Sequence, residues 1–417
     1  MRRLPKSPSA KISADSQRLV GLAQAVMQAS SRLEERTWEH HLGMLVRKLL
    51  KSTHQGAIDT ALDLAFKSQS IAYDALMDSI EAASESCVIE HDGQAYDALL
   101  IAAPILAWTR FSIAAGTIAP DMLTTLSAHM YAHILAPDVR MAMAPTLYAI
   151  DQLPRTHAET LAMTEQLAHA ALKGTAIGAL NDPPETAPFL ADTRYVLAVV
   201  TAKVGEPLFG WQDASNLNGR TQALTQWQAQ AQPNFARILP GCGIELLLPE
   251  AYYVACREAD KQIRPASIRA AIHYLTHTLA CEPTVLQAII GRFGEETSSG
   301  AVDEYRIGFT LHQHPDVVYG VVWPLYGQED EESSIEAAAT NASIRLTLGE
   351  AEEFTPLEEI LALLRECGVT HIKLHEGCFP MESCDDCGAS LYLDLDAELV
   401  HAEMPEEVAP QGSTHLH

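Results

Sequence analysis

The sequence predicts an α+β protein: a helical N-terminal region, an internally duplicated α/β core with pseudo-twofold halves, and a C-terminal segment that resembles a zinc knuckle. Three observations carry this prediction. Apolar residues recur at helical spacing up to about residue 88, strand and helix patterns alternate after about Cys87, and a Cys-Asp-Asp-Cys-Gly motif follows them. With 417 residues and 47% hydrophobic content, the chain is long enough to bury a sizeable core.

The N-terminal region reads as short amphipathic helices. Leu19, Leu22 and Val26 recur at three- and four-residue spacing, and the same spacing returns from Trp38 to Leu49. Four helices fit the stretch from 16 to 88. The positions before it, 1–15, carry basic residues without an apolar pattern and are expected to form a flexible tail.

The core is expected to alternate strands and helices. "YDALLIAAPIL", "RYVLAVVTAK" and "EPLFGW" are strand candidates. Thr156 and Glu159 form a capping box that opens one helix, and Thr355 with Glu358 opens another that Gly368 ends. We place the first half at 89–245, the second at 246–376, the Cys-rich knuckle at 377–404 and a disordered tail at 405–417.

The duplication rests on landmarks that recur in the same order. Residues 195–210 align without a gap with residues 305–320. Pro104 precedes Pro120 by the same interval that separates Pro249 from Pro265, and each second proline is expected to open a helix. Two related halves would place a cleft between them.

Composition restricts the partners. The chain carries 54 acidic and 28 basic residues, a formal net charge of −26, and such a surface disfavours the phosphate backbone of nucleic acids. Apolar stretches such as "ALLIAAPILAW" have about half the length of a bilayer-spanning helix. The basic start lacks an apolar stretch behind its charges. We therefore expect a cytoplasmic protein that binds neither nucleic acid nor membranes.

Two His-x-x-x-His pairs raise a metal hypothesis. His129 and His133 lie on one expected helix, and His273 and His277 lie on its counterpart. Residues four apart share a helical face, so four imidazoles would converge if the two helices met. The competing interpretation, histidines at the edge of the core, is favoured because Ile268, Ile272 and Leu275 make the apolar stripe beside the second pair.

Two arginines could bind an anion in the expected cleft. Arg110 follows Trp108, and Arg257 follows Tyr252 and Tyr253, at matching places in the two halves. An arginine beside an aromatic residue can hold a carboxylate or phosphate. Ordinary packing at the edge of the core, with a solvated guanidinium, is the preferred alternative.

Cys384 and Cys387 have the spacing of a metal-binding turn, in which Gly388 lets the backbone reverse. A redox dithiol would need positive neighbours, whereas Asp385, Asp386 and Glu382 should raise the pKa of the thiols. A dication would supply the missing positive charge. We expect zinc in a structural role, with unpaired buried thiols and a redox pair as the alternatives.

The remaining ligands have more than one solution. His375 and Cys378 would complete a set of four, although the gap that contains Pro380 is short for two turns that face one ion. His401 could return across a hairpin instead. A closed set of four ligands folds the chain and leaves no position for an activated water.

The chain resembles a proteobacterial family of this length that is classed only as a domain of unknown function, number 2863. The resemblance rests on "VIEHDGQAYDALLIAAPILAW", "IDQLPRTHAET" and "CDDCG" followed by "VHAEMPEE". It extends along most of the chain and implies no activity or substrate. Within the Cys-rich segment, it implies the Cys384/Cys387 turn and favours His401 over Cys378.

The sequence thus predicts a binding or regulatory protein, whose partner is another protein or a small molecule, with a structural zinc site at its C-terminus. The alternative is an enzyme that uses a metal or an anionic ligand between the two halves.

Overall fold

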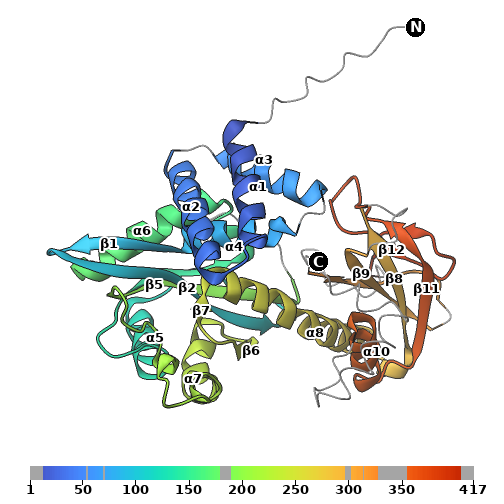
Figure 1. The fold of residues 1–417 in the computed structure, drawn as a ribbon. Coiled ribbons are helices and arrows are strands. Elements are labelled where there is room, and N and C mark those ends of the chain that lie inside the picture. Colours follow the sequence, from blue (N-terminus) through green and yellow to red (C-terminus); the bar gives the residue numbers. More distant parts are fainter. Residues whose placement is uncertain are drawn as a thin grey trace, which may run out of the picture.

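The computed structural model describes residues 13–52, 55–68, 71–178, 189–295, 302–312, 314–326 and 355–404. The predicted C-terminal tail lies outside these ranges, as does all but the end of the N-terminal tail. Two separate β-sheets form the framework, and the long helix α8 (Tyr252–Thr278) connects them (Figure 1).

Four helices form the N-terminal region, as the apolar spacing predicts. They are α1 (Ala14–Met27), α2 (Arg32–Lys51), α3 (Gln55–Lys67) and α4 (Ala72–Glu85). The buried face of each helix carries residues such as Leu19, Leu42 and Ile80. Their shared core also takes in Leu161 of helix α6 (His157–Lys173), so the region packs directly on the first sheet's helical layer.

The first sheet has the strand order β1-β2-β5-β4-β3, and β6 and β7 also pair with β2. Its strands are β1 (Ser86–His91), β2 (Gln94–Trp108), β3 (Gly116–Thr117), β4 (Arg140–Ala149), β5 (Ala191–Lys203), β6 (Gly243–Leu246) and β7 (Glu250–Ala251). The central strands β2 and β5 are buried along most of their length, which explains their nearly continuous apolar sequences.

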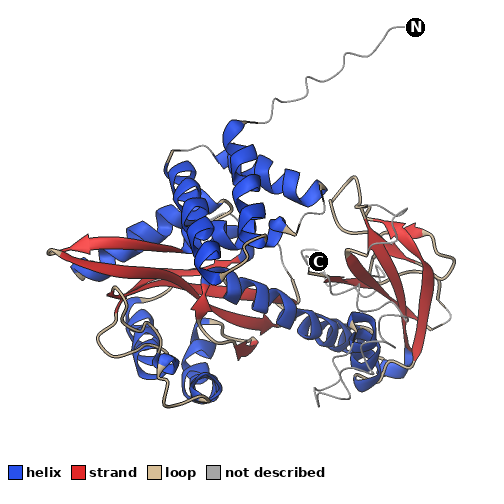
Figure 2. Cartoon of the chain, in the orientation of Figure 1, coloured by secondary structure: helices blue, strands red, loops and turns tan. Residues whose placement is uncertain are grey.

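Helices cover both faces of this sheet (Figure 2). Helices α5 (Pro120–His133) and α7 (Gly219–Phe235) pack on the face that contains Ile101 and Val196. Helix α6 and the first half of α8 pack on the opposite face, against Leu100 and Leu197. Alternate residues of each strand therefore enter different cores.

Local capping follows the sequence. The Thr156 and Glu159 side chains form the reciprocal capping box of α6. Thr355 and Glu358 do the same for α10 (Pro356–Glu366), and Gly368 follows it at a φ of +86°.

Helix α8 corrects one expectation, because Pro265 lies inside it and opens no helix. Proline cannot donate to the carbonyl oxygen of Lys261, four residues earlier. The Nε of Arg264 donates to that oxygen instead, at 3.2 Å, so the acceptor is satisfied. The same guanidinium donates to the Pro324 carbonyl oxygen and lies 5.0 Å from the Trp323 ring centroid. Arg264 thus replaces the hydrogen bond that Pro265 cannot make and anchors α8 to the second sheet.

The second sheet has the order β10-β9-β8-β11, in which β11 is parallel to β8 and the other pairs are antiparallel. Its strands are β8 (Leu286–Gly294), β9 (Glu304–Leu311), β10 (Tyr319–Pro324) and β11 (His371–Pro380). One face packs on α10 and the second half of α8, through residues such as Ile290 and Ile268.

The opposite face of this sheet holds the C-terminal segment. Its strands are β12 (Tyr392–Leu393) and β13 (Leu399–Val400). Three strand glycines, Gly291, Gly308 and Gly320, leave room for it. A Cβ at Gly320 would overlap the Tyr392 ring, one at Gly291 would overlap Leu393, and one at Gly308 would lie 3.2 Å from the Leu393 carbonyl oxygen. We call these three residues the glycine face.

The internal duplication is not shown by the topology. In the second half, α8 is followed by β8, β9, β10, α10 and β11, whereas in the first half helix α6 separates β4 from β5. In addition, β6 is antiparallel to β2 whereas β11 is parallel to β8. Pro104 lies inside β2. "EPLFGW" is not a strand, because Oε1 of Gln212 accepts hydrogen bonds from the N–H groups of Leu208 and Phe209 and closes a turn there.

Among the helices described, none is both long enough and apolar enough to cross a membrane.

Gly320→Ala should lower the free energy of unfolding by roughly 1 to 3 kcal/mol, because the new methyl group must displace the Tyr392 ring. Gly43→Ala in α2 is the matched control, since no atom lies near its added Cβ, and it should be neutral or stabilising by up to about 1 kcal/mol. Chemical denaturation measures both. Equal stability of the two variants would contradict the packing of Tyr392 on the glycine face.

Glu85 gives a pH-dependent prediction at the contact between α4 and α8. Its Oε2 accepts the Tyr253 N–H at 3.0 Å, and burial, with a smaller effect of Glu81, raises its pKa to about 7. The folded state therefore favours the protonated carboxyl group. Its stabilising contribution is complete below about pH 4.5 and is lost as the pH rises through 7.

Glu85→Gln keeps an acceptor for Tyr253 without the charge. The stability of this variant relative to the wild type should therefore grow by roughly 1 to 3 kcal/mol between pH 4 and pH 8. Urea denaturation across this range measures the difference, with Glu39→Gln on the exposed side of α2 as the control. A difference that does not change with pH would contradict the assignment.

Candidate metal centre

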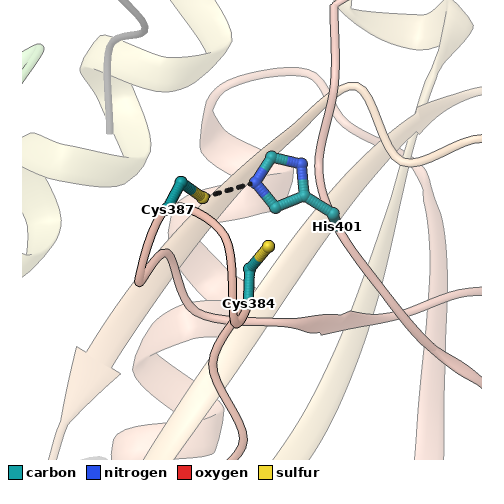
Figure 3. A group of neighbouring side chains, drawn as sticks. All are labelled: Cys384, Cys387 and His401. Carbon is teal, nitrogen blue, oxygen red and sulfur yellow. Dashed lines mark hydrogen bonds between the residues drawn. The ribbon is translucent and has the colours of Figure 1, made fainter.

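The turn from Cys384 to Gly388 presents two thiols to one side (Figure 3). The Gly388 N–H donates to the Cys384 carbonyl oxygen at 2.8 Å, and the Cys384 N–H donates to the Ala389 carbonyl oxygen at 2.7 Å. Gly388 has a φ of +76°, a backbone conformation that residues other than glycine rarely adopt. The predicted turn between Cys384 and Gly388 is therefore present.

His401, beyond β13, supplies a third donor (Figure 3). Its Nε2 lies 3.2 Å from Sγ of Cys387, and the donor atoms of Cys384, Cys387 and His401 all lie within 4.8 Å of one another. Within the part of the chain that the structure describes, no other group of three His, Cys, Asp or Glu residues meets this condition. These three residues could hold a metal ion, and we call them the Cys2His centre.

Glu403 lies next to the imidazole ring of His401. Its Oε1 lies 3.2 Å from Nδ1 of His401, on the side of the ring away from the thiols. Its backbone N–H donates to the Val317 carbonyl oxygen at 2.9 Å. Among the described residues, the buried Nδ1 has no hydrogen-bond partner, so Glu403 acts on the imidazole only through its charge, while Nε2 faces the Cys387 thiol.

The turn lowers the pKa of Cys384, contrary to the expectation from its acidic neighbours. The backbone N–H groups of Cys387 and Asp386 point to Sγ of Cys384 and stabilise its thiolate, while the Asp386 carboxylate acts in the opposite direction. The raised pKa was wrong for this thiol because the sequence shows the charges but not the direction of the N–H groups.

Arg306 of β9 fastens the turn to the second sheet, a role that the sequence pattern did not indicate. This side chain is only 3% exposed. Its Nη1 donates to the carbonyl oxygens of Glu382 and Leu391, at 2.7 Å each, so it holds both arms of the turn. Nε donates to Oε1 of Glu304, which compensates the buried charge.

His375 and Cys378 do not join the Cys2His centre. Both lie on β11. The His375 Nε2 donates to the Asp394 carbonyl oxygen at 2.9 Å, and Cys378 pairs with Arg292 of β8 in the strand register. Strand β11 thus holds the loop between β12 and β13, whereas the residues of the Cys2His centre all lie C-terminal to β11.

The two histidine pairs remain separate. The His129 and His133 rings stack with centroids 5.7 Å apart on α5, and Nε2 of His129 contacts Nδ2 of Asn234 on α7. Burial lowers the pKa of His133. His273 and His277 lie on α8 with centroids 6.5 Å apart. The structure does not bring the four imidazoles together.

The two arginines also have different surroundings. Nη1 of Arg257 lies 2.6 and 2.7 Å from the two carboxylate oxygens of Glu81 on α4, so this guanidinium is paired. Nη1 of Arg110 donates to Nε2 of His277 at 2.8 Å, and this side chain lines a cleft beside α8. Of these two arginines, only Arg110 therefore remains a candidate for ligand binding in that cleft.

Substitution at the Cys2His centre should remove the metal. Cys384→Ser, Cys387→Ser and His401→Ala should each reduce metal content from about one ion per chain to near zero, because two donors bind a dication weakly. Cys378→Ser and His375→Ala are the matched controls and should retain it, since their side chains lie outside the group. Elemental analysis after gel filtration measures this. Loss of metal from the controls alone would contradict the assignment.

Comparison with known proteins gives one match. The family model described as "Protein of unknown function (DUF2863)" matches residues 4–415. Neither the curated proteins nor the solved structures contain a match to the chain. The match covers nearly the whole chain, the Cys2His centre included, and the chain belongs to this family of proteins of unknown function, as the resemblance in its sequence indicates.

Proposed function

We propose that this protein is a binding or regulatory protein whose C-terminal segment is held in place by a structural zinc ion. The observation that carries the proposal is the position of the Cys2His centre. It joins the turn at Cys384 to the chain beyond β13, across a segment that packs on the glycine face.

The donor set favours zinc. Thiolate and imidazole ligands suit Zn²⁺, and oxygen-seeking ions such as Mg²⁺ or Ca²⁺ prefer carboxylates and carbonyls. The three donors leave one position of a tetrahedral site, and a structural role requires that a further side chain of the protein fill it. No disulfide bond joins any of the eight cysteines, all of which the structure describes, and this supports a reducing compartment such as the cytoplasm.

A structural role fits the weakness of the segment without metal. Strands β12 and β13 have two residues each, and a hairpin of this size is marginal in water. Its apolar contribution to the sheet consists of a few side chains, including Leu393, Leu395 and Leu399. Metal binding stabilises only the folded arrangement that brings the ligands together. Its binding free energy therefore adds directly to the stability of the folded segment.

The partner that we propose is a protein or a small molecule. A net charge of −26 argues against nucleic acid and anionic membrane surfaces. The enzyme hypothesis keeps one supporting observation, the contact between Arg110 and His277 in the cleft beside α8. That contact suits anion binding better than metal catalysis, because the four histidines do not converge.

Cobalt substitution separates a structural from a catalytic metal. We expect Co²⁺ at this centre to give the intense absorption of tetrahedral thiolate coordination, unchanged by added azide, and we expect a chelator to lower the melting temperature by several degrees. An azide-dependent spectral shift, with no loss of stability on chelation, would instead indicate an open catalytic position.

A further inference from the structure

A cleft of about 790 Å³ lies between the end of β2 and the second half of α8. This volume is within the range of small-molecule sites. On one side are the residues that follow β2, Trp108 to Phe111, together with Gly241 and Glu245. On the other side is one face of α8, where the lining positions recur at helical spacing: Ala266, Arg269, Ala270, His273, Tyr274 and His277.

The charge of this lining differs from that of the whole chain. Two guanidiniums, Arg110 and Arg269, face the cleft with a single carboxylate, that of Glu245. The chain overall has almost twice as many acidic as basic residues. Among the described residues, the ion pair of Arg269 is a long contact with Glu366, at 3.4 Å between two side chains that are half or more exposed, so Arg269 can turn to a ligand at little cost.

Arg110 is held near the cleft without being neutralised. Its neighbour Thr109 donates its N–H to the Leu190 carbonyl oxygen and its hydroxyl to the Gly241 carbonyl oxygen, which fixes the backbone. The guanidinium itself contacts an imidazole and lies 5.6 Å from the centroid of Phe111. Neither group carries a negative charge, so the positive charge of Arg110 is left for a ligand.

Three aromatic residues, Trp108, Phe111 and Tyr274, also line the cleft. Trp108 lies against Gly243, where a Cβ would overlap the indole ring. The ring therefore occupies the space that the glycine leaves open. Tyr274 is half-buried and lies 5.9 Å from Tyr319 of the second sheet, measured between ring centroids. Phe111 is 64% exposed beside Arg110. An exposed ring beside a guanidinium offers an aromatic ligand a surface on which to stack.

We infer that this cleft binds a planar aromatic anion, the chemistry shared by a nucleoside monophosphate and an aromatic carboxylate. The phosphate or carboxylate lies between Arg110 and Arg269, where a planar guanidinium can donate two hydrogen bonds. The aromatic ring lies against Phe111, Trp108 and Tyr274. This inference rests on the binding role proposed above, but not on the zinc ion.

Calorimetric titration of the full chain with AMP, benzoate, inorganic phosphate and adenosine tests it. We expect AMP or benzoate to bind with a dissociation constant below about 1 mM. Adenosine should bind at least about tenfold more weakly than AMP, because it lacks the charge, and inorganic phosphate should do so because it lacks the ring. Binding of AMP without benzoate identifies a nucleotide site, and the reverse identifies a carboxylate site.

Variants assign the contacts. Arg110→Gln and Arg269→Gln should each weaken binding of AMP or benzoate roughly tenfold or more. Phe111→Ala should weaken binding of the aromatic ligand without changing the affinity for inorganic phosphate. Arg36→Gln, on the exposed face of α2, is the matched control. All three cleft residues are exposed, so these variants should keep the wild-type melting temperature.

The inference is overturned if neither AMP nor benzoate binds below about 1 mM, if phosphate alone binds as tightly as AMP, or if Arg110→Gln binds like the wild type. Zinc content and melting temperature are measured on the same samples. If ligand binding fails in protein that retains zinc, the inference about the cleft is wrong. If the protein contains no zinc, the proposal of a structural metal is wrong, whatever the ligand binding.

Discussion

Helix α8 packs on both sheets of this fold, and Arg264 bonds to the one carbonyl oxygen that Pro265, inside the helix, cannot bond. Its first half packs on the first sheet through Ala255 and Ala259, and its second half packs on the second sheet through Ile268 and Leu275. Pro265 removes one backbone donor between the two halves, and Arg264 supplies a side-chain donor to the same carbonyl oxygen. Because the helix continues, the two sheets are joined by a single element and the cleft acquires its basic wall.

The C-terminal segment shows a second kind of dependence, in which a sheet leaves space for a short segment that packs on it. The glycine face removes side chains from three neighbouring strands, and Tyr392 and Leu393 occupy that space. Arg306 holds the two arms of the turn, which brings Cys384 and Cys387 within reach of His401. Packing, the hydrogen bonds of Arg306 and the Cys2His centre thus all involve the same short stretch.

Periodicity and capping predicted the helical N-terminal region, strands β2 and β5, and the two capped helices, because these features depend on residues close together in the chain. The Cys384/Cys387 turn could be predicted for the same reason. Pairing between distant strands could not be predicted from local patterns. The observed pairing is what leaves the internal duplication unsupported. Gly308 and Gly320 appeared in the aligned repeats, yet their structural use is to admit Leu393 and Tyr392. Likewise, nothing in the local sequence places His401, rather than His375 or Cys378, beside the thiols.

Hydrogen exchange of the metal-loaded and chelated protein tests most directly whether metal holds this segment on its sheet. The segment has amides in defined bonds, including Gly388 to the Cys384 carbonyl oxygen, Asp394 to that of Glu398, and Glu403 to that of Val317. We predict that chelation lowers protection of these amides at least tenfold and leaves α8 unchanged. Equal protection of residues 383–404 with and without metal would contradict the account.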